Sequence, residues 1–275
     1  MSLFITSLNS GSNGNCYYIG NTTEAVLIDA GISCRETERR MKRLGLSMES
    51  VKAIFVSHEH ADHITGIRVL SKKYQLPVYI TPNTLRSAGR ILEKDLIKHF
   101  KAGESVVVGE LIIKAFQKSH DAVDPHSFMI SASGINIGVF TDIGSCCDHV
   151  ISHFSQCHAA FLEANYCEEM LRDGNYPYIL KKRISGDDGH LSNSQALELF
   201  TKFRSKQLTH LILSHLSKNN NKPELVEQIF NAQAGTTRIV VASRYEETPV
   251  FCIETVSNEG LQNMEVLPKQ QLSLF

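Results

Sequence analysis

The sequence predicts an α/β protein in which two mixed β-sheets pack face to face with helices on their outer sides. Three observations predict this fold. Short apolar runs typical of strands recur along the chain, helical patterns are interleaved with them, and no linker, charge block or low-complexity tract divides the halves. The 275 residues, 42% hydrophobic and 21% charged, therefore predict a single domain over 1–275, with the last ~10 residues as a loose tail.

The first half of the chain contains most of the predicted strands. We expect helices at 34–44, 64–75 and 84–98, where the patterns are helical. The stretches VVVGELII and ISASGINIGVF have a turn between two apolar runs and predict hairpins. The strands expected here are 4–8, 16–20, 25–31, 53–57, 77–81, 105–109, 111–116, 128–133 and 135–142.

In the second half, helical and strand patterns follow one another. The expected helices are 146–156, one near 168–174, 194–204 and 224–232. The expected strands are 159–165, 210–214, 237–244 and 250–255. This alternation, together with the hairpins, predicts mixed sheets covered by helices.

Composition excludes several classes of protein. The formal net charge of −1 excludes recognition of nucleic acid through overall positive charge, so any phosphate-binding surface must be local. No segment has the ~20 apolar residues that span a bilayer and no leader pattern is present, so we expect a cytoplasmic protein without a membrane partner. Seven cysteines, an odd number without a C-x-x-C motif, predict reduced thiols.

The stretch FVSHEHADHITG, residues 55–66, predicts a metal site. If the strand stays extended, His58 and His60 project to the same side. Asp62 and His63 then come from the loop before the next helix. Imidazoles and carboxylates without thiolates suit zinc, manganese or iron. The alternative is an exposed loop that is merely rich in histidine, and the order H-x-H-x-D-H argues against it.

H-x-H-x-D-H after a strand resembles the signature of the metallo-β-lactamase fold superfamily. The resemblance implies a four-layer αββα sandwich of two similar halves with a metal site at the sheet edge. It also implies three further ligands after apolar runs, namely His120 in FQKSHD, Asp142 in GVFTDIG and His215 in LILSHLS. Asp29 in VLIDAG matches the early Asp of the fold, which orients a ligand histidine.

The same resemblance implies two divalent transition metals, zinc or manganese, with iron as an alternative. One would be held by three histidines, His58, His60 and His120. The other would be held by a carboxylate and two histidines, Asp62, His63 and His215. Asp142 would bridge the two ions, and Asp62 also belongs to the expected catalytic set. A water between cations about 3.5–4 Å apart would be the nucleophile. His60 stands where oxygen-reducing members carry Glu, which favours hydrolysis.

Several longer stretches resemble one branch of the superfamily, the YycJ/WalJ group, on the tRNase Z and RNase J side. They are SLNSGSNGNCYYI, VLIDAG, VSHEHADHITGI, SHDAVDP, FLEANY, GHLSN and LSHLSKNNN, and the resemblance covers residues 3–255. It implies a nuclease whose partner is nucleic acid, namely DNA, with 5′-to-3′ exonuclease action and a link to DNA repair. Glu163 and His190 would be a catalytic pair that assists protonation of the leaving oxygen.

Polar residues near the expected site are candidates for binding phosphate. Ser192 or Asn193 is expected as a helix N-cap, with free N–H groups facing the site. Ser217, Lys218 and Asn219 follow the last expected ligand and could hold a neighbouring phosphate. The stretch GSNGN, residues 11–15, is either an ordinary hairpin turn or a rim that donates backbone N–H groups.

Two basic stretches could follow a nucleic-acid backbone. For the first, on the helix expected at 34–44, a solvated helix face is the default interpretation. The second, Lys181 to Arg183, immediately precedes GDDGH and could equally contact substrate. Tryptophan is absent and no aromatic platform is recognisable, so any nuclease action should be weakly sequence-specific.

Two other functions are compatible with the sequence. A small-molecule phosphodiesterase, lactone hydrolase or thioester hydrolase of the same fold would need a deep closed pocket, whereas an open groove lined by Lys181 to Arg183 would favour a nuclease. A non-catalytic nucleic-acid-binding repair protein would need neither the complete ligand set nor the proton-relay pair. The sequence leaves the oligomeric state open.

Overall fold

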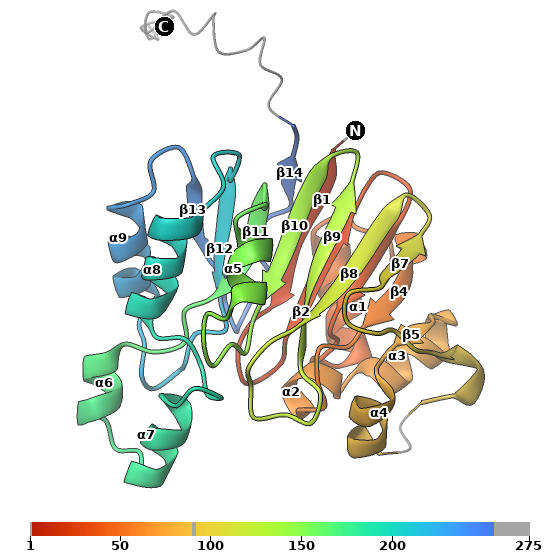
Figure 1. The fold of residues 1–275 in the computed structure, drawn as a ribbon. Coiled ribbons are helices and arrows are strands. Elements are labelled where there is room, and N and C mark those ends of the chain that lie inside the picture. The colour runs from red at the N-terminus through yellow and green to blue at the C-terminus, as the bar shows by residue number, and fades with distance from the viewer. Residues whose placement is uncertain (1, 90–91, 256–275) are drawn as a thin grey trace, which may run out of the picture.

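The computed structural model describes residues 2–89 and 92–255, and it confirms the predicted α/β sandwich (Figure 1). Two seven-stranded sheets face each other, and helices lie on their outer sides. No helix in the described ranges is long and apolar enough to cross a membrane. The loose tail expected over the last residues falls at 266–275, outside the described residues.

The first sheet consists of strands from the first half of the chain and the last strand. They are β1 (Leu3–Asn9), β2 (Cys16–Gly20), β3 (Ala25–Ile28), β4 (Val51–Phe55), β5 (Val78–Tyr79), β6 (Ile97–Lys98) and β14 (Phe251–Ile253). Their order is β14-β1-β2-β3-β4-β5-β6. The pairs from β14 to β3 are antiparallel, and those from β3 to β6 are parallel.

The second sheet has the corresponding mixture. Its strands are β7 (Ser105–Val108), β8 (Leu111–Gln117), β9 (His126–Ala132), β10 (Ile135–Phe140), β11 (Ala159–Glu163), β12 (His210–Ser214) and β13 (Arg238–Val241). Their order is β13-β12-β11-β10-β9-β8-β7. The pairs from β7 to β10 are antiparallel, as the two predicted hairpins require, and those from β10 to β13 are parallel.

Helices cover both outer faces. Over and beside the first sheet lie α1 (Cys34–Arg43), α2 (Ala61–Ile64), α3 (Ile67–Tyr74) and α4 (Pro82–Ala88), with 3₁₀ turns η1 (Met48–Ser50) and η2 (Lys94–Leu96). Over the second lie α5 (Asp148–Phe154), α8 (Asn193–Phe203) and α9 (Pro223–Asn231). By contrast, α6 (Glu168–Asp173) and α7 (Tyr178–Ile184) lie beyond the end of the second sheet (Figure 1).

Apolar side chains fill three layers because successive residues of a strand point to opposite faces. In β4, Ala53 and Phe55 point into the core between the sheets, whereas Ile54 points toward the outer helices. The inner core is rich in aromatic rings, and the centroids of Tyr17 and Phe161, from opposite sheets, are 4.8 Å apart. The sandwich is therefore a closed, tightly packed scaffold that can hold a site rigidly at its edge.

The strands that carry the expected site residues end at one edge of this scaffold. Asp29 directly follows β3, and the parallel strand β4 leads to His58. In the second sheet, Asp142, Glu163 and His215 lie at or just beyond the ends of the mutually parallel strands β10, β11 and β12. Carboxyl ends of parallel strands meet at a common edge, so residues far apart in the sequence converge there.

The predicted helix over 84–98 was wrong beyond Ala88. Helix α4 ends there because Gly89 adopts φ 79° and ψ −174°, which is not helical. The segment Ile97–Lys98 instead pairs with β5 as a strand. Leu85 and Leu92 both pack against the apolar residues on the outer face of the first sheet, although they belong to separate segments. Their spacing in the sequence therefore resembled that of a single helix.

The structure also divides the helix expected at 64–75 and adds one that was not expected. The break falls at Gly66, where a side chain would lie 1.9 Å from the carbonyl oxygen of Ile32. Helix α7 was not predicted, because the side chains of Tyr178 and Ile179 are both about four-fifths exposed. A helix that buries no apolar face leaves no periodic signal in the sequence.

Candidate metal centre

The motif after β4 brings its histidines together with one from the second sheet. Nε2 of His58 lies 3.1 Å from Nδ1 of His60. A potential ligand atom from each of these two residues and from His120 lies within 4.8 Å of the others. Three imidazoles from two distant segments thus form one potential set of metal ligands, the set expected from the sequence.

A second group adjoins the first. Asp62, His63 and His215 also offer ligand atoms within 4.8 Å of one another. Oδ2 of Asp62 lies 3.5 Å from Nε2 of His63 and 3.5 Å from Nε2 of His215. Asp142 lies between the groups, with Oδ2 3.2 Å from Nε2 of His63 and Oδ1 3.8 Å from Nε2 of His120. This is the place that a bridging carboxylate would occupy.

The donor atoms of these groups fit metal ions. Nε2 of His120 and Nε2 of His215 are buried and have no hydrogen-bond partner among the described residues. Leaving a buried polar atom without a partner costs about 1–3 kcal/mol, so such atoms are expected to meet a ligand. Imidazole nitrogens and carboxylate oxygens without thiolates are a suitable donor set for zinc, manganese or iron.

Three of the site residues adopt a strained backbone conformation. Asp29, Asp142 and His215 have φ values of 60°, 55° and 57°, in the left-handed region. Such a conformation is unfavourable for residues with a Cβ and typically costs of order 1 kcal/mol or more. Each one follows a strand, and the resulting turn directs the side chain back toward the edge where the ligand groups meet.

Hydrogen bonds fix the direction of the histidine rings. Asp29 accepts from the backbone N–H and the hydroxyl of Ser57, both at 2.8 Å, and lies 2.7 Å from Nδ1 of His63. Nδ1 of His120 donates to the carbonyl oxygen of Gly189 at 3.0 Å. In both rings Nδ1 is engaged in this way, so Nε2 is the nitrogen that faces the ligand groups.

Glu163 is fully buried and makes four contacts with its two oxygens. Oε1 lies 2.7 Å from Nδ1 of His190 and 2.9 Å from Nδ1 of His215. Oε2 accepts from the backbone N–H groups of Ile143 and Leu191 at 2.7 and 3.2 Å. The predicted Glu163–His190 pair is therefore in contact. Because Glu163 is buried, its carboxylate contacts only these two rings and two backbone N–H groups among the described residues.

The charges of the site balance one another. Burial raises the pKa of Asp142, but the His215 and His63 rings outweigh this effect and hold it well below its usual range. Burial likewise raises the pKa of Glu163, yet His190 brings it down to about 2. Burial lowers the pKa of His215, but Asp142 and hydrogen-bonded carboxylates raise it to about 10. The ionised carboxylates thus lie beside positive charge, which the histidine rings supply and which divalent cations could also supply.

A cleft of about 220 Å³ opens beside these groups. His190, His215 and Ser217 line it together with Ser12, Asp121 and Arg183. The residues of the second basic stretch, Lys181 to Arg183, therefore do not all line the same space. Arg183 lines the cleft and pairs with Asp121, whereas Lys181 donates to the carbonyl oxygen of Arg172 at 2.6 Å and lines a separate hollow.

The first basic stretch lies on α1 and is largely engaged within the protein. Arg39 and Arg40 both pair with Glu36, and Arg43 pairs with Glu247. Arg40 is buried and also donates to the carbonyl oxygen of Tyr245 at 2.8 Å. This arrangement agrees with a structural role for the helix.

Ser192 is the N-cap of α8, as predicted, and three N–H groups at the start of this helix have partners within the protein. Its hydroxyl accepts from the N–H of Gln195, and its own N–H donates to the Gln195 side chain. The N–H of Asn193 donates to the carbonyl oxygen of Tyr166, and its side-chain amide bonds to that of Asn221. Phosphate binding by Ser192 and Asn193 therefore stays a prediction, and their own N–H groups are engaged elsewhere.

The residues after His215 are placed differently from one another. Ser217 lines the cleft, and its hydroxyl accepts from the N–H of Asn220 at 3.3 Å. Lys218 is exposed and lines a neighbouring cavity. Asn219 is exposed and donates to the hydroxyl of Tyr176, which also lines the cleft.

Two residues that sequence reasoning missed contact the expected ligands. Ser57 lies 2.9 Å from Nδ1 of His58. The amide of Asn15 lies 3.1 Å from Oδ2 of Asp62 and 3.1 Å from Nε2 of His63. Asn15 belongs to GSNGN, so this stretch reaches the site through a side chain, and Ser12 of the same stretch lines the cleft. The position of Ser57 directly before His58 was a signal for it.

The chain is similar in sequence to a known protein family and to several of its members. A family model described as the beta-lactamase superfamily domain matches residues 24–215. Exodeoxyribonuclease YycJ of Bacillus anthracis is 35% identical over 228 residues, which are 82% of this chain and 86% of that protein. Exodeoxyribonuclease WalJ of Streptococcus pneumoniae is 32% identical over 240 residues, 83% of this chain and 88% of that protein.

Among solved structures, Zn²⁺-bound PqqB from Methylobacterium extorquens superimposes with a TM-score of 0.70. The alignment covers 91% of this chain and 99% of that one, at 13% sequence identity. At this identity the likeness shows a common fold.

Proposed function

The chain belongs to the beta-lactamase superfamily and to its YycJ/WalJ group, and on that premise we propose that it is a two-metal DNA exonuclease acting from 5′ to 3′. The observation that carries the proposal is the contact between Glu163 and His190 beside a double set of ligand atoms. A protein that only binds nucleic acid has no use for a positioned acid at such a centre.

The proposed ligands are the two groups described above, with Asp142 between them. His58, His60 and His120 would hold one ion, and Asp62, His63 and His215 the other. Two divalent ions, zinc or manganese with iron as an alternative, would supply a nucleophilic water and neutralise charge on the scissile phosphate. Asp62 counts among both the ligands and the catalytic residues of this proposal.

His190 is the proposed general acid. Its Nδ1 is held by Glu163, so Nε2 is the nitrogen available to the cleft that the ring lines. A 3′ oxygen is a poor leaving group unless it is protonated, and an acid placed for this step typically contributes 10²–10⁴-fold in rate. In the reaction, OH from water joins phosphorus, the bond from phosphorus to the 3′ oxygen breaks, and a proton ends on that oxygen.

DNA as the substrate is carried over from the relatives, both of which are named exodeoxyribonucleases. We extend the proposal to a role in DNA repair and to a cytoplasmic location. The cleft has few aromatic side chains, so the rate should depend little on base sequence.

One experiment tests the function. The protein is incubated with Mn²⁺ and with DNA or RNA strands of one sequence, labelled at either end. We expect immediate release of labelled mononucleotide from 5′-labelled DNA and a gradual ladder from 3′-labelled DNA. Internal fragments would contradict an exonuclease. Hydrolysis of bis-p-nitrophenyl phosphate or a lactone without hydrolysis of DNA would identify a small-molecule hydrolase, and binding without turnover a non-catalytic protein.

A further inference from the structure

A second cavity, of about 300 Å³, adjoins the cleft at the metal centre. Leu216 and Ser217 line both spaces, so they form a shared wall. Ser10 also lines the second cavity, and its hydroxyl accepts from the N–H of His215 at 2.7 Å. The volume is at the lower end of the range for small-ligand sites and suits a single nucleotide.

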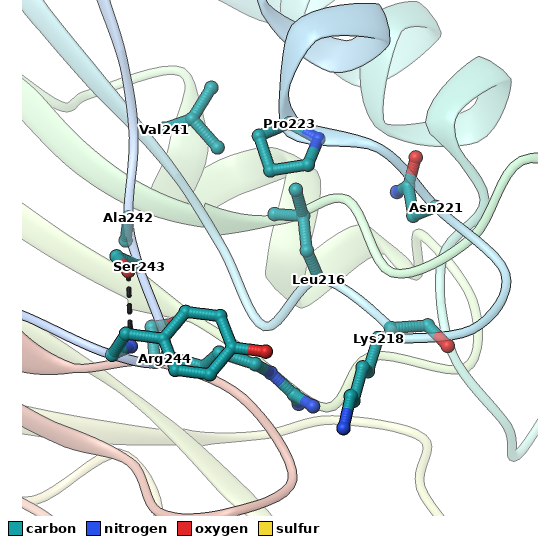
Figure 2. Close-up of a pocket in the computed structure, with 11 residues that line it drawn as sticks. Leu216, Lys218, Asn221, Pro223, Val241, Ala242, Ser243 and Arg244 are labelled. Carbon is teal, nitrogen blue, oxygen red and sulfur yellow. Dashed lines mark hydrogen bonds between the residues drawn. The ribbon is translucent and has the colours of Figure 1, made fainter.

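The two ends of this cavity differ in character (Figure 2). Leu216, Pro223 and Val241 form an apolar end. At the other end the side chains of Lys218 and Arg244 point toward each other. An apolar end beside a pair of cations matches a ligand that combines a flat, weakly polar ring with a phosphate.

Arg244 is held in place by the GSNGN turn. Its Nη2 donates to the hydroxyl of Ser12 at 3.0 Å, and the side chain of Asn13 donates to its carbonyl oxygen at 2.8 Å. Gly11 makes room for the guanidinium, because a Cβ there would lie 2.8 Å from Nη2. The glycine and polar residues of this turn thus position an arginine that is 232 positions further along the chain than Ser12.

Both cations lack an acidic partner. Glu247, in the same loop as Arg244, pairs with Arg43. Across residues 2–89 and 92–255, no ion pair involves Lys218 or Arg244, and the guanidinium of Arg244 donates instead to the hydroxyl of Ser12. A half-buried arginine that is fixed in position and left without a counter-ion is a site prepared for an anion, since guanidinium binds phosphate through two parallel hydrogen bonds.

We propose that this cavity binds the 5′-phosphorylated terminal nucleotide of the strand being degraded. Lys218 and Arg244 hold the 5′-phosphate, the apolar end receives sugar and base, and the exposed ring of Tyr245 stacks at the mouth. The proposal deepens the proposed function and rests on it. With the terminal nucleotide in the cavity, its 3′ oxygen and the next phosphate extend past Leu216 and Ser217 into the cleft.

The geometry explains how successive cuts follow one another. Hydrolysis that expels a 3′ oxygen leaves the phosphate on the shortened strand. That strand therefore carries a new 5′-phosphate and is again a ligand for the cavity. A 3′ end carries a hydroxyl and offers the two cations nothing, so the cavity selects the direction of degradation.

The test compares one single-stranded DNA with a 5′-phosphate or a 5′-hydroxyl in Mn²⁺. We expect wild-type kcat/KM to favour the phosphorylated strand roughly 10- to 100-fold, the usual range for charge-assisted hydrogen bonds. Arg244→Met and Lys218→Met should each lose most of this preference, mainly through KM, and Arg244→Lys should retain part of it. Lys222→Met is the matched control, because Lys222 is exposed and does not line the cavity.

A wild-type enzyme that does not discriminate between the two strands would overturn the proposal, as would unchanged discrimination in folded Arg244→Met. Equilibrium dialysis with thymidine 5′-monophosphate and thymidine separates the possible sources of the ligand. If the monophosphate binds and Arg244→Met abolishes this binding, the cavity also accepts free nucleotide. If the enzyme prefers the 5′-phosphorylated strand but does not bind the monophosphate, the cavity accepts only the ends of strands. Arg244-dependent binding by a protein that hydrolyses no nucleic acid would uphold the cavity and overturn the proposed function.

Discussion

Oε1 of Glu163 lies 2.7 Å from Nδ1 of His190 and so determines which nitrogen of that ring faces the cleft. The same oxygen lies 2.9 Å from Nδ1 of His215. One carboxylate thus orients both the proposed acid and a proposed ligand. The buried Asp29 does the same for His63 on the first sheet, so each sheet provides one carboxylate behind the ligand groups.

Glu163→Gln should therefore affect both catalysis and metal binding. We expect kcat on DNA to fall by about 10²–10⁴-fold because His190 loses its charged partner. Metal affinity should fall about 10- to 100-fold, as is usual when the acceptor behind a ligand histidine is altered. Metal titration followed by kinetics at saturating Mn²⁺ separates the effects. Unaltered metal affinity would show that the contact with His215 is dispensable.

Ser57 and Ser127 are a matched pair of buried serines for testing the support behind the ligands. The Ser57 hydroxyl bonds to Asp29 and His58, whereas the Ser127 hydroxyl has no partner among the described residues. Ser57→Ala should lower the free energy of unfolding by about 1–3 kcal/mol, and Ser127→Ala should leave it unchanged or raise it. Urea denaturation of both variants measures the difference, and equal losses would contradict the role given to Ser57.

Metal content tests the place of Asp142. The protein purified without chelator should hold close to two transition-metal ions per chain, as the two adjoining ligand groups require. Asp142→Ala should lose at least one of them, because its carboxylate lies between the groups. Asp95→Ala, at an exposed position, is the control. Elemental analysis decides, and retention of both ions in Asp142→Ala would contradict bridging.

The sequence predicted which side chains converge at the sheet edge, because each of them is tied to a local pattern. His58, His60 and His63 share one short motif, and Asp142 and His215 each follow an apolar run. A strand that ends at the sheet edge must deliver the next residues there. Local sequence therefore determines the position, and the resemblance to a known family supplied the roles.

Contacts across long sequence separations could not be predicted in this way. Arg244 contacts Ser12, which is 232 positions earlier in the chain, and the GSNGN stretch that contains Ser12 does not indicate this partner. The N–H of Asn193, at the start of α8, donates to the carbonyl oxygen of Tyr166, which lies on another segment of the chain. Helix α7 was missed for a related reason: with Tyr178 and Ile179 exposed, its sequence has no buried face to reveal it.

The cysteines should play no part in turnover. Burial raises the pKa of the Cys146 thiol to about 12, so at pH 8 this group remains protonated and unreactive. Cys252 is exposed and should be alkylated first. Mass spectrometry of protein treated with iodoacetamide, alongside DNA hydrolysis, should show labelling without loss of rate. Inactivation in step with labelling of Cys146, with metal content intact, would contradict a water nucleophile.

His190→Ala should separate protonation of the leaving group from metal binding. His190 lines the cleft and belongs to neither three-residue group of proposed ligands, so the variant should retain two metal ions. On DNA, kcat should fall about 10²–10⁴-fold, or roughly 3–5 kcal/mol of barrier at 1.36 kcal/mol per decade. On a p-nitrophenyl phosphodiester the loss should be much smaller, because p-nitrophenolate leaves without a proton.

Comparing the rates on the two substrates shows which role His190 has. Equal losses on DNA and on the p-nitrophenyl ester would mean that His190 binds the phosphate and does not protonate the leaving oxygen. Loss of a metal ion would mean that His190 is a ligand. The experiment needs to exclude this, because His190 lies beside Asp142, Glu163 and His215. His190→Asn, which keeps a polar side chain near Glu163 but cannot act as an acid, should behave like His190→Ala on DNA while preserving stability.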